Sequence, residues 1–200
     1  WLIVLPCTVG LAVLSLPIVK LIYMRGAFDI AAAKLTSGAL LYYSLGIPFL
    51  SLQTLLTMAF LAEKDNITPL IRDIIGVLLN ATLNYIFGIR LHMYAAGFAL
   101  GTAISWTVLC LWLYNSWTRR HHIRIFALAG KIWKSTLGSM IMFLFIIGWQ
   151  HYIPYEGLHL IILIICSAVV YFASLLILRD ENMRDLTRQA ISKVSSYIRH

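Results

Sequence analysis

The stretch Thr57-Met-Ala-Phe-Leu-Ala-Glu-Lys-Asp-Asn-Ile-Thr-Pro69 organises the chain, because one apolar run ends in it, a polar turn follows, and a second apolar run begins. Thr68 suits the N-cap of a helix, and Pro69 suits the first helical position, where its missing N–H is not needed. The stretch therefore predicts a helix start at these two residues. The charged residues before them indicate the point where the first run leaves an apolar environment.

The composition outside this turn is that of a membrane protein. The chain is 60% hydrophobic and 12% charged, with a mean hydropathy of +0.84. Four intervals hold no Asp, Glu, Lys or Arg, and each exceeds the roughly 20 residues that cross a bilayer as a helix. They cover 35–62, 91–118, 135–155 and 157–178. An ordinary soluble domain is therefore excluded.

The apolar pattern predicts an all-α, polytopic membrane helix bundle, because membrane strands alternate over about ten residues instead of running continuously apolar. Kinks are expected at Pro6, Pro17 and Pro48, which fall inside the predicted spans. Residues 1–178 are predicted to form one bundle, followed by a cytoplasmic amphipathic helix on the membrane surface over 179–200. The six predicted spans are 1–24, 35–61, 69–89, 95–117, 132–150 and 157–178.

The basic residues are distributed unevenly between the two sides of this predicted bundle. With six spans both termini lie on one side, together with 12 of the 16 Lys and Arg. By the positive-inside rule this side is the cytoplasm, and the net charge of +8 then sets topology and contacts anionic membrane lipids without any nucleic acid partner. The four on the opposite side are Lys20, Arg25, Lys34 and Arg90. The twelve are Lys64, Arg72, Arg119, Arg120, Arg124, Lys131, Lys134, Arg179, Arg184, Arg188, Lys193 and Arg199.

Two asparagines within the third span are candidate site residues. Asn80 and Asn84 are one helical turn apart, and an amide inside a membrane must find hydrogen-bond partners. A short link makes the third and fourth spans antiparallel neighbours, so Thr102 can meet both asparagines. Such an oxygen-rich cluster either binds Na⁺ or joins the two helices by hydrogen bonds. Both interpretations stay open on the residues alone.

The fourth span carries small residues at a spacing that favours close helix packing. Gly97, Gly101 and Ser105 recur every four residues, which allows another helix backbone to approach. At the outer end of the first span, Lys20 either extends toward the interface or faces a cavity that attracts an anionic group such as phosphate. Arg25 lies beside it in sequence. No zincin, nucleophile-elbow or Walker motif is present, so we expect neither an enzyme nor a cofactor.

Three segments in order resemble the MviN family, the MurJ-type lipid II flippases of the multidrug/oligosaccharidyl-lipid/polysaccharide exporter superfamily. They are PIVKLIYMRGAF over 17–28, AFLAEKDNITP over 59–69, and AGFALGT over 96–102, with Asn80 between the last two. The resemblance covers residues 6–115. It implies a two-lobed helical bundle of which this chain forms the C-terminal lobe. The chain opens at Trp1 within an apolar run, so we expect it to begin inside a longer protein.

The resemblance also implies a function. The whole protein would move lipid II, the undecaprenyl-pyrophosphate-linked peptidoglycan precursor, across the bacterial cytoplasmic membrane by alternating access. Lys20 and Arg25 would approach the outer end of the cavity, while the main substrate-binding arginines lie in the N-terminal lobe. Some members bind sodium through an Asn, an Asp and a Thr that correspond to Asn80, Asn84 and Thr102 here. Because Asn84 lacks the carboxylate charge, coupling to Na⁺ or to the membrane potential stays open.

Two alternatives remain at this stage. A flippase of polysaccharide units, or a drug exporter of the same superfamily, would share the fold and differ in substrate. A membrane scaffold that recruits cell-wall synthesis proteins through its basic loop and tail belongs to another class. Loss of recruitment on deletion of residues 181–200, with flipping unchanged, would favour the scaffold.

Overall fold

The computed structural model describes residues 1–24, 29–121, 126–152 and 157–178. The chain divides into two compact units, Cys7–Ala127 and Trp1–Pro6 together with the residues from Leu128 onward. Each unit is described by itself. Arg25 and the predicted amphipathic helix over 179–200 lie outside the described residues.

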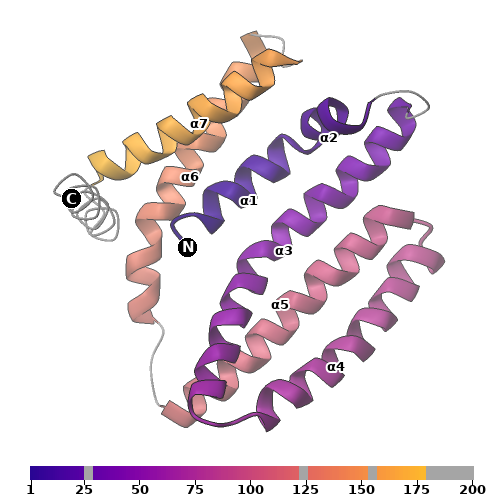
Figure 1. Cartoon of the computed structure of the whole chain (residues 1–200), viewed down its shortest axis with the longest axis vertical. Coiled ribbons are helices and arrows are strands. Elements are labelled where there is room, and N and C mark those ends of the chain that lie inside the picture. The colour runs from indigo at the N-terminus through magenta and orange to yellow at the C-terminus, as the bar shows by residue number, and fades with distance from the viewer. Residues whose placement is uncertain (25–28, 122–125, 153–156, 179–200) are drawn as a thin grey trace, which may run out of the picture. The chain divides into compact units, whose positions relative to one another are not determined.

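Within the described ranges all regular elements are helical (Figure 1). Five helices are long and apolar enough to cross a membrane, and a bent helix pair at the start of the chain adds a sixth span if it is counted as one. The predicted all-α polytopic membrane fold is therefore confirmed. The elements are α1 (Val4–Val13), α2 (Ser15–Tyr23), α3 (Ile30–Ala62), α4 (Ile67–Asn84), the π-helix η1 (Tyr85–Arg90), α5 (Tyr94–His121), α6 (Phe126–Tyr152) and α7 (Leu158–Ile177).

The first predicted span is two helices rather than one kinked helix. α1 and α2 meet at Leu14 with a bend of 73°. The cause is Pro17, which has no N–H for the carbonyl of Val13 and whose ring collides with that carbonyl in a continuous helix. Pro48 also lies inside a helix, yet α3 continues through it. Pro6 falls in the first turn of α1, where its missing N–H is not needed.

In the second unit α5 lies between α3 and α4, which approach each other mainly near the turn that joins them (Figure 1). Gly46 of α3 packs against Ala103 and Trp106 of α5, and Gly76 of α4 packs against Leu109. Near the turn, a small apolar core forms where α3 meets α5. It consists of Leu56, Phe60 and Leu113.

The packing of α5 against α4 and η1 depends on residues without bulky side chains. A Cβ atom added to Gly97 would lie 2.5 Å from the carbonyl oxygen of Phe87. One added to Gly101 would lie 2.7 Å from Oδ1 of Asn84 and 3.2 Å from its backbone nitrogen. Ser105, the third member of the predicted ridge, is buried. The two backbones therefore approach closely along this side of α5.

The first unit contains α6 and α7. Gly138 of α6 packs against Ser174 and Tyr171 of α7, with 2.9 Å between its ideal Cβ position and Oγ of Ser174. The hydroxyl of Ser174 donates to its own helix, at the carbonyl of Tyr171. The Tyr171 hydroxyl donates to the carbonyl of Leu2 at 2.6 Å, which ties the start of the chain to α7.

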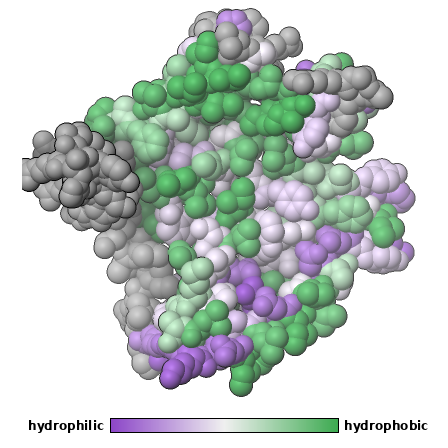
Figure 2. All heavy atoms as spheres, in the orientation of Figure 1, coloured by the Kyte–Doolittle hydropathy of each residue, from purple (hydrophilic) through white to green (hydrophobic). Residues whose placement is uncertain are grey.

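The outward faces of the long helices are apolar. Figure 2 shows hydrophobic side chains covering much of the visible surface, and hydrophilic ones near the end of the second unit where α3 turns into α4. Large apolar side chains stay exposed on every long helix, among them Val77, Leu144 and Val169. Exposing such surface to water costs about 25 cal/mol per Å². These faces therefore suit contact with lipid chains.

Candidate functional site

The turn between α3 and α4 begins with a left-handed residue. Lys64 has a φ of 62°, and its N–H donates to the carbonyl of Leu61 at 2.9 Å. The N–H of Asp65 donates to the carbonyl of Phe60 at 3.0 Å. This pair of bonds is the Schellman motif, which satisfies carbonyls that the end of a helix leaves free. It reverses the chain and places Asp65 at the start of the next helix.

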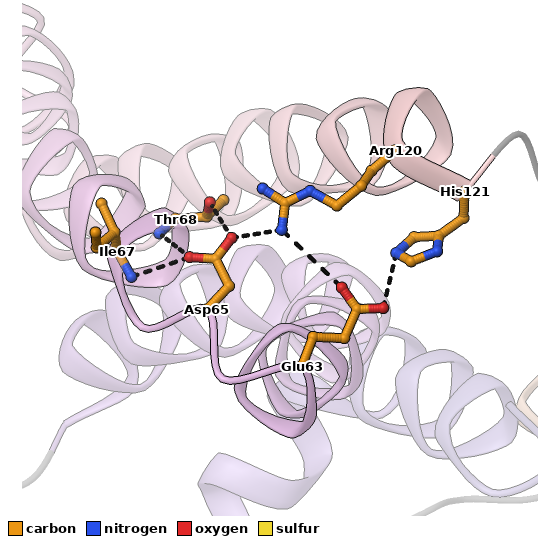
Figure 3. A network of polar contacts seen from close by, with 6 residues as sticks. All are labelled: Glu63, Asp65, Ile67, Thr68, Arg120 and His121. Atoms are coloured by element: carbon orange, nitrogen blue, oxygen red, sulfur yellow. Dashed lines mark hydrogen bonds and ion pairs between the residues drawn. The ribbon is translucent and has the colours of Figure 1, made fainter.

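The predicted start of this helix is wrong by a short distance, because Asp65 and not Thr68 caps it (Figure 3). α4 begins at Ile67. Oδ1 of Asp65 accepts from the N–H of Ile67 at 3.1 Å and from that of Thr68 at 3.0 Å. Its Oδ2 accepts from the Thr68 hydroxyl at 2.7 Å. A carboxylate satisfies several donors at once, so it displaces Thr68 from the cap and leaves Pro69 in the first turn, buried.

The end of α5 supplies a cation to this cap (Figure 3). Nη1 of Arg120 lies 2.6 Å from Oδ2 of Asp65 and 4.0 Å from Oε2 of Glu63. The N–H and hydroxyl of Thr68, and then the guanidinium of Arg120, hold the pKa of Asp65 well below its usual range. His121 places Nε2 3.0 Å from Oε1 of Glu63, an ion pair when the imidazole is protonated. Its orientation falls short of a hydrogen bond.

Aromatic rings support these charged groups. The guanidinium of Arg120 lies over the Phe60 ring, 5.3 Å from its centroid. Trp117 meets Phe60 edge-on at 5.0 Å and packs against the His121 ring at 4.1 Å. A cation over an aromatic face is attracted to it, by about 0.5–1 kcal/mol at exposed sites. The end of α5 is therefore held to the turn by charge and by ring packing together.

The pairing of Asp65 with Arg120 is not evident from the sequence. In the sequence, the basic residues near the end of α5 read as topology signals, and Glu63 and Asp65 as the charges of a turn. Asp65 and Arg120 are 55 positions apart, and no local pattern joins them. One feature of the sequence could have indicated the pairing. Asp65 and Arg120 both lie at span ends that are predicted to be on the same side of the membrane.

The two asparagines of α4 and Thr102 of α5 do meet. Nδ2 of Asn80 donates to the Thr102 hydroxyl at 3.1 Å, and Nδ2 of Asn84 donates to Oδ1 of Asn80 at 2.8 Å. The Thr102 hydroxyl donates to the carbonyl of Phe98 at 2.9 Å. Oδ1 of Asn84 is buried and has no partner among the residues that the structure describes. The chain of hydrogen bonds crosses from one helix to the next.

This arrangement fits a helix junction better than a sodium site. A sodium ion needs several oxygens free to point at it, and in a membrane it favours an anionic ligand. Here Oδ1 of Asn80 already accepts from Asn84, and the Thr102 oxygen already accepts from Asn80. Oδ1 of Asn84 is left without a donor among the described residues, and none of the three groups is charged. The sodium site therefore stays a prediction, while the hydrogen-bonded junction between α4 and α5 is present.

Lys20 lies in the last turn of α2 and is partly exposed. Its carbonyl accepts from the N–H of Met24 at 3.0 Å, which closes the helix end. No ion pair or hydrogen bond of its ammonium group is found with the described part of the chain. Arg25, predicted to act with it, lies outside the described residues, so their joint role stays a prediction.

Apolar outward faces, close helix contacts and polar junctions between helices define a multi-pass helical membrane protein. Comparison with known sequences identifies the family within this class. Residues 1–177 match the family described as lipid II flippase MurJ, and the chain belongs to this family. The resemblance inferred from the three sequence segments is thereby confirmed.

Several relatives carry the same description. The lipid II flippase MurJ of Thermosipho africanus is 32% identical over 176 residues, 88% of this chain and 35% of the relative. A probable lipid II flippase MurJ of Thermotoga maritima is 29% identical over 190 residues, 92% of this chain and 37% of the relative. A solved structure titled lipid II flippase MurJ, inward closed conformation, is similar with a TM-score of 0.75 and 28% identity. That similarity covers 93% of this chain and 37% of the solved one.

Proposed function

We propose that this chain acts as the C-terminal lobe of a lipid II flippase in the bacterial inner membrane. The observation that carries the proposal is the family match over residues 1–177, to which the similarity in fold adds support. The chain spans about a third of the length of the curated relatives, 35% and 37% in the two examples above. The remaining lobe, which would contribute the main substrate contacts, is the first partner that the proposal requires. Lipid II and membrane lipids are the others.

The described contacts suit helices α3, α4 and α5 that move as one body during alternating access. The carboxylate of Asp65 caps α4 and pairs with Arg120 of α5, while its backbone N–H closes α3. At mid-span, Asn80 and Thr102 join α4 to α5 a second time. Two junctions at different depths prevent one helix from rotating against the other. The proposed activity is transport of the substrate.

The orientation follows from charge. With the excess of Lys and Arg on the side of the α3–α4 turn, the positive-inside rule places this turn and the termini in the cytoplasm. Lys20 then lies toward the outer face, where its ammonium group attracts the pyrophosphate of an arriving precursor. Coupling to Na⁺ at the cluster around Asn80 and coupling to the membrane potential both stay predictions.

A depletion strain tests the proposal. The complete protein is supplied either unchanged or with Lys20→Glu, and lipid II reaching the outer leaflet is measured. We expect the unchanged protein to restore exposure and the variant to lower it several-fold. Lys34→Glu is the matched control, because Lys34 is exposed near the start of α3 on the same predicted side.

Two outcomes would contradict the proposal. Normal lipid II exposure after depletion, with loss of another exported lipid-linked saccharide, would identify a polysaccharide-unit flippase. Unchanged flipping in cells that lose recruitment of cell-wall synthesis proteins on deletion of residues 181–200 would identify a scaffold.

A further inference from the structure

Arg72 is a buried cation between two helices. It lies in α4, where the sequence alone indicates only a topology signal, and it is 8% exposed. Its Nη2 donates to Oγ1 of Thr57 on α3 at 2.9 Å, and its Nη1 lies 3.1 Å from Oδ1 of Asp73. Burying a charged group is costly unless its donors are satisfied. The Nε–H of Arg72 is buried and has no partner among the described residues.

The facing helix carries the complementary group. Gln53 of α3 is 6% exposed, and its Oε1 is buried without a donor in the described part of the chain. Gln53 lies one helical turn from Thr57, whose hydroxyl donates to the Gln53 carbonyl at 2.9 Å. Because residues four apart share a helix face, Gln53 and the partner of Arg72 lie on the same side of α3. An unpaired donor and an unpaired acceptor therefore occupy one interface.

The third helix, α5, offers mainly apolar buried side chains at this level. Gly76, one turn beyond Arg72 on α4, packs against Leu109 of α5, so α5 passes at this level. Its buried side chains there are apolar or nearly so: Leu109, Cys110 and Leu113. Leaving a buried polar group unpaired is costly. A small polar ligand that contacts both groups removes that cost for each.

We propose that an ordered water molecule binds between Nε of Arg72 and Oε1 of Gln53 and bridges α4 to α3. Water accepts from the first group and donates to the second. An anion would satisfy Arg72 but would be repelled by the Gln53 oxygen and by Asp73, and a cation would be repelled by Arg72. Buried waters in proteins typically make about three hydrogen bonds to such groups. Asp73 is 62% exposed, so the side of Arg72 that it pairs with opens toward solvent.

A double-mutant cycle on the complete purified protein tests this bridge. Gln53→Met keeps the volume and removes the acceptor, while Arg72→Leu removes the donor. We expect Gln53→Met to lower the Tm in the unchanged protein, and to lower it much less when Arg72 is already Leu. Additive losses of Tm would overturn the proposal. Thr54→Ala is the control, because Thr54 is exposed on the same helix and donates only to the carbonyl of Leu50.

A direct contact between Arg72 and Gln53 would also give coupling in the double-mutant cycle. An experimental structure at a resolution that reveals water distinguishes a direct contact from a water bridge. We expect density within hydrogen-bond distance of both Nε of Arg72 and Oε1 of Gln53. A direct contact between these two atoms, or an interface with no water density, would overturn the proposal. Neither readout depends on transport, so failure here leaves the proposed flippase function untouched.

Discussion

Nη1 of Arg120 lies 2.6 Å from Oδ2 of Asp65, although the two residues are 55 positions apart. The same carboxylate caps α4 through the N–H groups of Ile67 and Thr68. One side chain thereby connects the start of α4 to the end of α5. Because the N–H of Asp65 also closes α3, three helix ends depend on this residue.

The pH dependence of stability tests the charge on Asp65. Its lowered pKa means that the unfolded chain takes up a proton before the folded protein does. The contribution of the ionised Asp65 to folding stability is therefore complete above the pKa of Asp in the unfolded chain, about 3.9. It is lost as the pH falls through the lower pKa of Asp65 in the folded protein. We expect Asp65→Asn, which can still accept from Thr68, to lower the Tm at neutral pH. The difference from the unchanged protein should shrink as the pH falls below about 4, and a constant difference would contradict the assignment.

The left-handed backbone of Lys64 predicts a stabilising substitution. A φ of 62° costs a residue with a Cβ atom about 1 kcal/mol, and glycine avoids that cost. We expect Lys64→Gly to raise the Tm in a thermal unfolding measurement. Asn66→Gly is the matched control, since Asn66 has a φ of −89° and gains nothing from glycine. A lower Tm for Lys64→Gly would show that the lysine side chain itself stabilises the turn.

Close packing along α5 predicts a graded loss of stability. Gly97→Ala places a methyl group against the Phe87 backbone, which cannot move aside, and we expect a loss of about 3 kcal/mol. Gly101→Ala should lose less, since part of its contact is the movable side chain of Asn84. Gly148→Ala in α6 meets nothing within 4 Å and should be neutral or slightly stabilising. Equal effects at all three positions would contradict the close approach.

The hydrogen-bond chain predicts unequal roles for the two asparagines. Asn80→Ala removes the central group and leaves Nδ2 of Asn84 unpaired, so we expect a loss of about 2 kcal/mol. Asn84→Ala removes one hydrogen bond and leaves Oδ1 of Asn80 without its donor, but it also removes the unpaired oxygen of Asn84, so it should cost less than Asn80→Ala. Chemical or thermal unfolding of both variants gives the order. The reverse order would show that the unpaired oxygen of Asn84 has a partner of its own.

Sodium provides a separate test of the same cluster. On the helix-junction interpretation, we expect the Tm of the unchanged protein to be the same in NaCl and in choline chloride. Asn80, Asn84 and Thr102 carry no charge and hydrogen-bond to one another. Asn84→Asp adds the missing charge and should make the Tm depend on Na⁺. A Na⁺-dependent Tm in the unchanged protein would contradict the helix-junction interpretation.

Many of the polar contacts could not be predicted from the sequence, because each side chain depends on a partner from another helix. Thr68 and Pro69 indicated a helix start, but two residues upstream of Ile67 a stronger acceptor, Asp65, takes the cap. Arg72 looked like any basic residue near a membrane exit, and its burial follows from its reach to Thr57 on another helix. The chance that Asn80 meets Thr102 was predictable, because a short link makes their helices antiparallel neighbours.

The sequence by itself determined the all-α membrane fold and the places of its spans. Long intervals without charge have few stable structures in a bilayer, where every backbone group must find its partner within a helix or a closed barrel. Only the tertiary structure decided the break at Leu14, the cap at Asp65, its pairing with Arg120 and the hydrogen bond from Arg72 to Thr57. Packing brings together side chains that are far apart in the chain, and their energies depend on distances and burial that no local spacing encodes.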